Sequence, residues 1–115
     1  MKRPCVYILA SKPYGTLYVG VMSDINQRMS LHAQGLLAGF TKRYRVTTLV
    51  YYEMHETMVQ AIAREKLLKR WHRAWKYRLI ETMNPEWRDL FDPESGEVLF
   101  GPAEVERLTG EPAPD

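Results

Sequence analysis

A cation and an imidazole share the apolar stripe of a predicted helix. If the chain is helical from Ile25, then Arg28 and His32 fall within about 60° of that residue around the helix axis. Met29 lies on the same side. An inward-facing arginine is costly unless it meets an anion or lines a wet cleft. The spacing therefore indicates a site where a guanidinium group receives a negatively charged ligand, with an imidazole one turn away.

A carboxylate occupies a comparable place on a second predicted helix. The segment Thr57-Met58-Val59-Gln60 has the form of a capping box, with Gln60 three residues after the cap. In the helix that follows, Glu65 falls about 20° from the middle of the apolar arc, which consists of Met58, Ala61, Ile62 and Leu68. An acidic side chain is thus expected to point inward.

The elements that must position these groups alternate between strands and helices. Residues 5–10 and 16–21 are rich in β-branched and aromatic residues and flank turn-forming residues, which predicts a β-hairpin. Ser23 or Asp24 caps the first helix, and Gly35 or Gly39 ends it. Residues 46–53 predict a third strand. A short third helix is expected over residues 74–83, packed against Leu67 and Trp71.

Composition limits the architecture to one small domain. The chain has 115 residues, 45% of them hydrophobic, which suits a single modest core. Its one cysteine, Cys5, excludes an internal disulfide and favours a reducing compartment. The first apolar run is too short for a signal peptide, and none is long enough to span a membrane. We therefore expect a cytoplasmic protein that does not enter a membrane.

The charge is divided unevenly along the chain. Residues 1–83 hold 14 Lys and Arg against 5 Asp and Glu, a formal charge of +9, whereas residues 84–115 hold 2 against 9, a charge of −7. We predict a domain over residues 1–83 and an acidic tail over residues 84–115. The tail either forms one hairpin around Ser95-Gly96 or is partly disordered. A basic body favours a polyanionic partner, with nucleic acid first.

The ordered set of these residues carries a family resemblance. Val6-Tyr7-Ile8 precedes Tyr18-Val19-Gly20 with ten residues between the two tyrosines, and the helical Arg, His and Glu follow in order. Residues 4 to about 83 resemble a GIY-YIG nuclease domain of the small single-domain bacterial type. This type is similar to the N-terminal nuclease module of the nucleotide-excision-repair endonuclease. Cys5 departs from the pattern, since it replaces the glycine of the first motif.

The resemblance implies both a fold and a reaction. The implied fold is α/β (α+β), a three-stranded antiparallel sheet flanked by helices, and the implied reaction is metal-dependent cleavage of a DNA phosphodiester. Tyr7 and Tyr18 match the tyrosines that flank the scissile phosphate, the second often being assigned as general base. Arg28 matches the arginine that neutralises the phosphate, and His32 the residue that assists a catalytic tyrosine. Glu65 matches the sole carboxylate ligand of Mg²⁺ or Mn²⁺.

Two basic segments are candidates for DNA contact. One is a basic, aromatic loop, and the other lies between Arg64 and Arg78, where seven cations are interleaved with Trp71, Trp75 and Tyr77. Aromatic rings among cations suit stacking on bases. The expected DNA-binding residues are Lys42, Arg43, Tyr44, Lys69, Arg70, Arg73 and Lys76. The structural alternative is that these cations form solvated faces without a partner.

Two function classes remain open. The first is a DNA endonuclease of low sequence specificity, because one small domain has little surface for reading base edges. The second is a non-catalytic nucleic-acid-binding module of the same fold, or one whose target is structured RNA. The structural alternative for Arg28 and Glu65 is a buried ion pair without chemistry. A nucleotide-hydrolysing enzyme is disfavoured because the chain lacks a glycine-rich phosphate loop. The oligomeric state, monomer or weak homodimer, is left open, as is a role in DNA repair.

Overall fold

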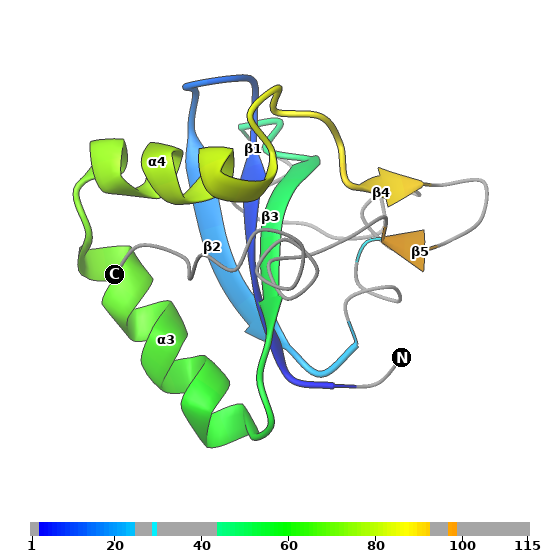
Figure 1. Cartoon of the computed structure of the whole chain (residues 1–115), viewed down its shortest axis with the longest axis vertical. Helices are drawn as coiled ribbons and strands as arrows, with labels where there is room; N and C mark the ends of the chain where they lie inside the picture. The colour runs from blue at the N-terminus through cyan, green and yellow to red at the C-terminus, as the bar shows by residue number, and fades with distance from the viewer. Residues whose placement is uncertain (1–2, 25–28, 30–43, 93–96, 99–115) are drawn as a thin grey trace.

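The fold is an antiparallel sheet with helices packed on it (Figure 1). A computed structural model of the chain describes residues 3–24, 29, 44–92 and 97–98. Three strands form the main sheet in the order β2-β1-β3, with bounds Cys5–Ala10 for β1, Leu17–Met22 for β2 and Thr48–Met54 for β3. Two helices follow, α3 (Met58–Arg70) and α4 (Arg73–Met83). The expected three-stranded antiparallel sheet with flanking helices is confirmed.

The β1–β2 hairpin closes through a tight turn. The backbone N–H of Gly15 donates to the carbonyl of Lys12 at 2.9 Å, and that of Ser11 donates to the carbonyl of Thr16 at 3.0 Å. Tyr14 adopts a positive φ of 59°, a conformation that costs a residue with a side chain some strain. Tyr77 on α4 offsets this strain, because its one hydroxyl hydrogen is shared between the carbonyls of Tyr14 and Gly15. The turn is thereby fixed to α4.

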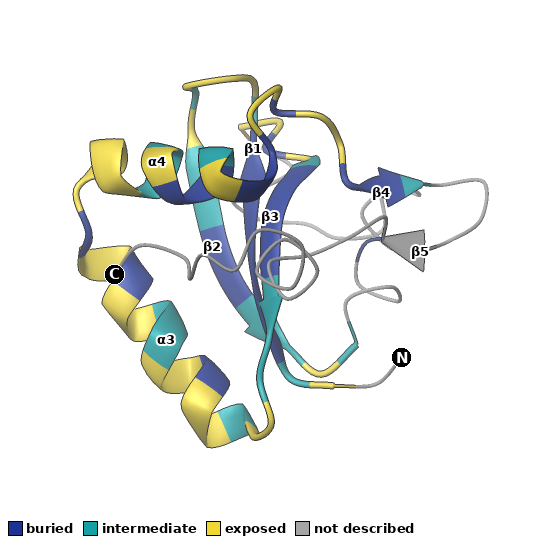
Figure 2. Cartoon of the chain, viewed as in Figure 1, coloured by how far each residue is buried: buried dark blue, intermediate teal, exposed yellow. Residues whose placement is uncertain are grey.

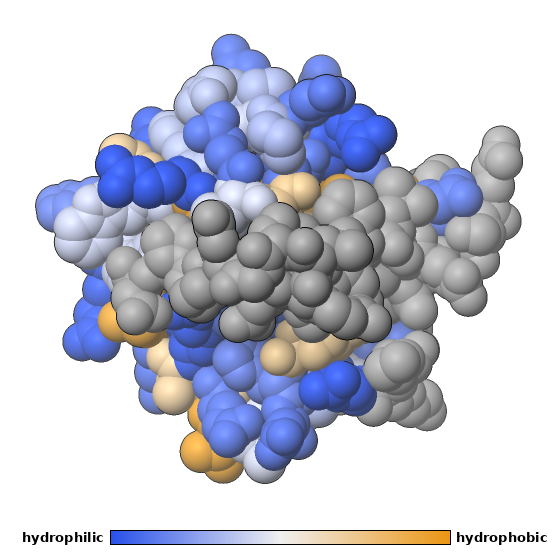
Figure 3. Space-filling view, in the orientation of Figure 1, coloured by the Kyte–Doolittle hydropathy of each residue, from blue (hydrophilic) through white to orange (hydrophobic). Residues whose placement is uncertain are grey.

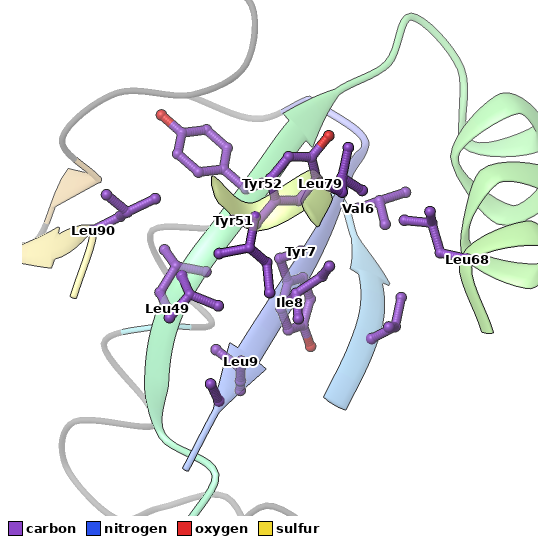
Figure 4. Close-up of a cluster of buried hydrophobic side chains, with 14 of the residues drawn as sticks. Val6, Tyr7, Ile8, Leu9, Leu49, Tyr51, Tyr52, Leu68, Leu79 and Leu90 are labelled. Atoms are coloured by element: carbon purple, nitrogen blue, oxygen red, sulfur yellow. The ribbon is translucent and has the colours of Figure 1, made fainter. Parts of the chain in front are cut away.

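Helices α3 and α4 cover one face of the sheet, and the strands supply most of the buried side chains of the described core. β1 is buried along its whole length, as expected for the central strand (Figure 2). α3 packs against β1 and β2, and α4 packs against β3. Buried side chains from all of these elements converge in the cluster of Figure 4, including Val6 and Ile8 of β1, Tyr51 of β3, Leu68 of α3 and Leu79 of α4.

The capping box predicted the start of α3 correctly. The Thr57 side chain accepts a hydrogen bond from the backbone N–H of Gln60 at 3.2 Å. The buried strip of α3 is narrower than the predicted apolar arc, since Ala61 and Leu68 are buried but Ile62 is exposed. Ile62 lies outside the strip that touches the sheet, so the prediction that it is a core residue is wrong.

The junction between α3 and α4 is built from aromatic residues. Trp71 ends α3 and packs edge-to-face on Trp75 of α4, with ring centroids 5.9 Å apart. This contact confirms the expected packing of Trp71 against the third helix. Leu67, for which the same packing was expected, lies at the surface, and that part of the prediction is wrong.

The packed structure continues beyond Met83. Asn84, Trp87, Leu90 and Phe91 are buried, and the backbone N–H of Leu90 donates to the carbonyl of Leu49 on β3 at 2.7 Å. Strands β4 (Phe91–Asp92) and β5 (Glu97–Val98) then pair antiparallel, which agrees with the predicted hairpin. The boundary after residue 83 stays a prediction. Within the described residues, no helix is long and apolar enough to cross a membrane.

Candidate active site

Tyr7 and Tyr18 meet on one face of the sheet. The register pairs Tyr7 with Gly20 and Leu9 with Tyr18, and side chains of directly paired residues point to the same face. The two tyrosine rings lie with their centroids 6.3 Å apart and their planes tilted by 42°. Tyr7 is 3% exposed and Tyr18 is half-buried, so the pair has one buried and one accessible member.

Gly20 makes this approach possible. A Cβ atom built on Gly20 would lie 2.5 Å from both the Cζ and the hydroxyl oxygen of Tyr7, and 3.0 Å from Cε1 of Tyr18. Any side chain at this position would collide with the buried Tyr7 ring, which has little room to move. The glycine of the second motif is therefore a steric requirement of the tyrosine pair.

Glu65 lies on the inner side of α3. Ala61 and Leu68 are fully buried and mark the centre of the strip that faces the sheet. Arg64 and Glu65 flank this strip on opposite sides, because successive helical residues are about 100° apart. Both side chains are largely buried, at 15% and 16% exposure.

The ion pair of Arg64 shows which strand each flank of α3 faces. The Nε of Arg64 donates to Oε1 of Glu53 on β3 at 2.8 Å. Since β3 and β2 lie on opposite sides of β1, the other flank of α3, which carries Glu65, is turned toward β2. β2 is the strand of Tyr18. Within the described residues, the ion pair that Glu65 makes is with Lys69, at 3.6 Å.

The contacts of Glu53 fix the orientation of α3. Besides Arg64, its carboxylate accepts hydrogen bonds from the Tyr51 hydroxyl at 2.5 Å and from Nε2 of His55 at 2.8 Å. Burial is the largest single influence on Arg64 and would lower its pKa, but the charge of Glu53, the hydrogen bond to Glu53 and the interaction with Tyr51 together outweigh burial and raise that pKa. Burial, and then the Glu53 charge, raise the pKa of Tyr51 well above its usual range. Arg64 is therefore a permanently charged structural partner in this network.

The first predicted helix lies mostly outside the described residues. Met29 alone is described there, in helical conformation and 2% exposed, in line with its expected place on the apolar stripe. Arg28 and His32 fall outside the described residues, as do Lys42 and Arg43 of the basic loop.

The remaining predicted DNA-binding residues lie at the surface. Tyr44 is exposed, as are Lys69, Arg70 and Arg73, while Lys76 is half-buried. Trp75 is also exposed and was not among the predicted site residues. In the sequence Trp75 lies among cations, which suggests contact with DNA. Trp71 and Tyr77 lie among the same cations, but their side chains pack against other parts of the fold, so sequence context alone does not single out Trp75. Asn84, which was not among the predicted site residues, fixes the end of α4: its Nδ2 donates to the carbonyls of Val50 and Arg88.

Glu65 by itself suits a hard divalent cation that takes most of its ligands from water and substrate. No group of three or more His, Cys, Asp or Glu side chains gathers in the described part of the chain. A closed protein cage for a metal is therefore absent from that part. Mg²⁺ commonly takes one or two carboxylates and completes its shell with waters and substrate phosphate. A single largely buried carboxylate such as Glu65 fits this mode of binding.

Comparisons with known proteins agree on one family. The family model described as "GIY-YIG catalytic domain" matches residues 3–78. UPF0213 proteins of Staphylococcus aureus strains Mu3, Mu50 and N315 are each 42% identical to the chain over 76 residues, which cover 66% of this chain and 92% of the relative. No solved structure matches the chain.

Proposed function

The chain belongs to the GIY-YIG catalytic domain family, a nuclease superfamily, and on that premise we propose that it is a metal-dependent endonuclease that hydrolyses DNA with low sequence specificity. The observation that carries the proposal is the contact of Tyr7 and Tyr18 across Gly20. This arrangement requires all three motif residues at once.

The two tyrosines differ in what they can do. Tyr18 is half-buried, so its hydroxyl can meet a water molecule or a phosphate. We assign it as the general base for the attacking water. Because a neutral phenol is a weak base, Tyr18 needs help from nearby cations or from His32. Tyr7 is buried against Gly20 and is assigned to positioning the phosphate.

The charged residues complete the proposed site. Arg28 is assigned to the phosphate, because its planar guanidinium can donate to two phosphate oxygens as negative charge builds. Glu65 would hold Mg²⁺ or Mn²⁺, which would supply neutralisation of charge on the phosphate oxygens. The flank of α3 that carries Glu65 is turned toward β2, the edge strand that bears Tyr18. Because α3 packs on the face of the sheet that carries Glu53, whereas Tyr18 points to the other face, Glu65 would reach Tyr18 around this edge.

The compartment and the biological process are proposed from charge and cysteine content. A basic body, an acidic C-terminal segment and a single buried cysteine are compatible with a cytoplasmic protein that acts on DNA in repair or processing. A monomer or weak homodimer is proposed, since the tyrosine pair is formed within one chain.

A cleavage assay decides between enzyme and binding module. Pure protein is incubated with end-labelled single-stranded, duplex and branched DNA in Mg²⁺, in Mn²⁺ and in EDTA. We expect cleavage in at least one metal and none in EDTA, because only the charge-neutralised phosphate reacts at a useful rate. Binding without cleavage under every metal condition would leave the non-catalytic module as the function.

Glu65→Gln tests the assignment of the metal ligand. We expect this variant to lose cleavage while its DNA affinity stays within about twofold, because affinity depends on the cationic surface. Glu81→Gln, which changes a carboxylate on α4, is the matched control and should cleave like the parent. Unchanged turnover in Glu65→Gln would rule out Glu65 as the ligand.

A further inference from the structure

Trp75 is the one tryptophan or tyrosine between residues 64 and 78 that the fold leaves exposed at the surface. Its side chain is 47% exposed. Trp71 is buried at the end of α3, and the hydroxyl of Tyr77 is bound to the β1–β2 turn. A large exposed indole on a small domain therefore remains without an explanation from the fold.

The Trp75 ring packs against two other rings of the protein. It makes edge-to-face contacts with Trp71, at 5.9 Å and 84°, and with His72, at 5.4 Å and 88°. Trp71 in turn lies under the guanidinium of Arg64, 5.3 Å from its ring, and Arg64 is bound to Glu53. Because the ring is supported by this series of contacts, little side-chain entropy would be lost when a ligand stacks on it.

The cations around Trp75 lack acidic partners in the described part of the chain. No described carboxylate lies within 4 Å of Arg70, Arg73 or Lys76. Burial, and then the charge of Arg73, lower the pKa of Lys76. Strongly hydrophilic side chains cover the left-hand end of α4 in Figure 3. This surface combines positive charge with an exposed indole, and both are complementary to a nucleotide: the phosphate meets the cations and the base meets the ring.

We propose that Trp75 stacks on an unpaired base, with Arg73 and Lys76 on the adjacent phosphates, so that the preferred substrate is DNA containing a single-stranded segment. In a continuous duplex the faces of every base are covered by neighbouring pairs, and such DNA could meet only the cations. An unpaired base exposes its face and gains stacking energy from an aromatic side chain. The reaction that follows binding rests on the proposed nuclease function; the stacking itself does not.

Glu65 and Trp71, the residue that supports the Trp75 ring, are separated by a short stretch of α3, which fits one continuous DNA path. Glu65 precedes Trp71 by six helical residues, about 9 Å along the axis of α3. Lys69, bound to Glu65, lies between them. A strand bound on Trp75 and running along α3 would thus bring a phosphate a few nucleotides away toward Glu65. The unpaired base and the cleaved bond would belong to the same stretch of DNA.

The test measures binding in EDTA, where no cleavage occurs. Fluorescence anisotropy gives the affinity of parent, Trp75→Ala and Trp75→Phe proteins for labelled single-stranded DNA and for a blunt duplex of the same sequence. We expect Trp75→Ala to weaken binding to the single strand about tenfold and binding to the duplex less than twofold. Trp75→Phe, which keeps an aromatic ring, should recover most of the loss. Thermal melting checks that the variants are folded.

Two controls separate stacking from charge. Arg73→Gln should weaken both DNA forms by similar factors and reduce the salt dependence of binding, because it removes a phosphate contact. A single-stranded oligomer made only of abasic sites should bind parent and Trp75→Ala equally. Equal losses of Trp75→Ala on single strand and duplex, or an undiminished affinity for the single strand, would overturn the proposal.

The stacking proposal and the nuclease proposal can be confirmed or overturned separately. If Trp75 proves necessary for single-strand binding but no metal supports cleavage by the parent, the stacking proposal stands and the nuclease proposal fails. If the parent cleaves and Trp75→Ala cleaves single-stranded and duplex DNA with the parental preference, the nuclease proposal stands and the stacking proposal fails.

Discussion

At the scale of single residues, the missing side chain of Gly20 lets two tyrosines share one small area of the sheet. The Tyr7 ring occupies the space where a Cβ on Gly20 would lie, and Tyr18 borders the same space. The tyrosines differ in accessibility, since Tyr7 is buried and Tyr18 is half-buried. That difference gives each a distinct expected part in catalysis.

Replacing Tyr18 or Tyr7 by phenylalanine tests these two assignments. We expect Tyr18→Phe to lower the single-turnover cleavage rate at least about a hundredfold, the usual scale for loss of a general base. Tyr7→Phe should lose less, because it positions the phosphate without accepting a proton. Both variants should melt near the parent temperature, since each loses one hydroxyl and no apolar volume. A normal rate for both variants would make the tyrosine pair structural; a dead Tyr7→Phe beside an active Tyr18→Phe would reverse the assignments.

Cys5 provides a pH-dependent reporter of burial. Burial, followed by the charges of Asp24 and Glu53, raises the pKa of its thiol from 9.0 to about 12. Above pH 9 the unfolded chain releases this proton and the folded chain keeps it, so the folded state loses stability as pH rises. We expect the free energy of unfolding to fall by about 1 kcal/mol between pH 9 and pH 10 from this group.

Urea titrations at pH 8, 9 and 10 measure that fall, with Cys5→Ala as the comparison. The variant should lack the Cys5 contribution in this interval, whatever its absolute stability. Tyr14 and Tyr51, whose pKa values are also raised, contribute mainly above pH 10, where an unfolded tyrosine begins to ionise. Parallel pH profiles for parent and variant would show that the thiol is accessible in the folded protein.

At the scale of elements, α3 is placed by one network of charges. Glu53 on β3 accepts hydrogen bonds from Tyr51, His55 and Arg64, and Arg64 also lies over Trp71 at the α3–α4 junction. This network sets the rotation of α3 about its axis. The direction of Glu65, and the support behind Trp75, both depend on that rotation.

Glu53→Ala should destabilise the protein by about 3 kcal/mol, because it leaves the largely buried Arg64 without a counter-charge. Glu65→Gln is the matched control, since Glu65 has only a 3.6 Å contact with the exposed Lys69 and should cost less than about 0.5 kcal/mol. Chemical denaturation of both variants gives the comparison. Similar small losses for the two would mean that the Glu53 network does not hold α3.

At the scale of the whole molecule, the chain divides into a basic body and an acidic C-terminal segment. Part of that segment is integral to the fold: Trp87, Leu90 and Phe91 are buried, and β4 pairs with β5. Residues 99–115 lie outside the described residues and hold 4 Asp and Glu against 1 Arg, a formal charge of −3. The two parts of the segment therefore need separate tests.

Deletion of residues 99–115 keeps β5 and removes net negative charge. We expect the shortened protein to bind DNA about threefold more tightly at low salt, because like charges on protein and DNA repel. The difference should disappear above about 0.3 M salt, where charges are screened over short distances. A full-length variant carrying Glu104→Gln, Glu106→Gln and Glu111→Gln separates charge from length. Equal affinity of all three proteins across the salt series would show that the segment is inert toward DNA.

Local sequence patterns were sufficient for the elements and for the identity of the motif residues. The strands, the Thr57 cap and both described helices follow from alternation, turn residues and capping, which act over a few residues. The placement of Glu65 on the inner side of α3 follows from helical spacing in the same way. Ile62 and Leu67 were misplaced because spacing gives the direction of a side chain but not the width of the surface that covers it.

Only the tertiary structure decided which of several equivalent residues remain available for function. Trp71, Trp75 and Tyr77 are alike in sequence context, but Trp71 ends a helix in the core and Tyr77 fastens a turn about sixty residues away in the chain. The sequence does not distinguish Arg64 from the other cations between residues 64 and 78, and only the fold places Glu53 of β3 beside it. The physical reason is that burial and charge pairing depend on contacts between distant segments, whereas a sequence pattern reports only the residues next to it.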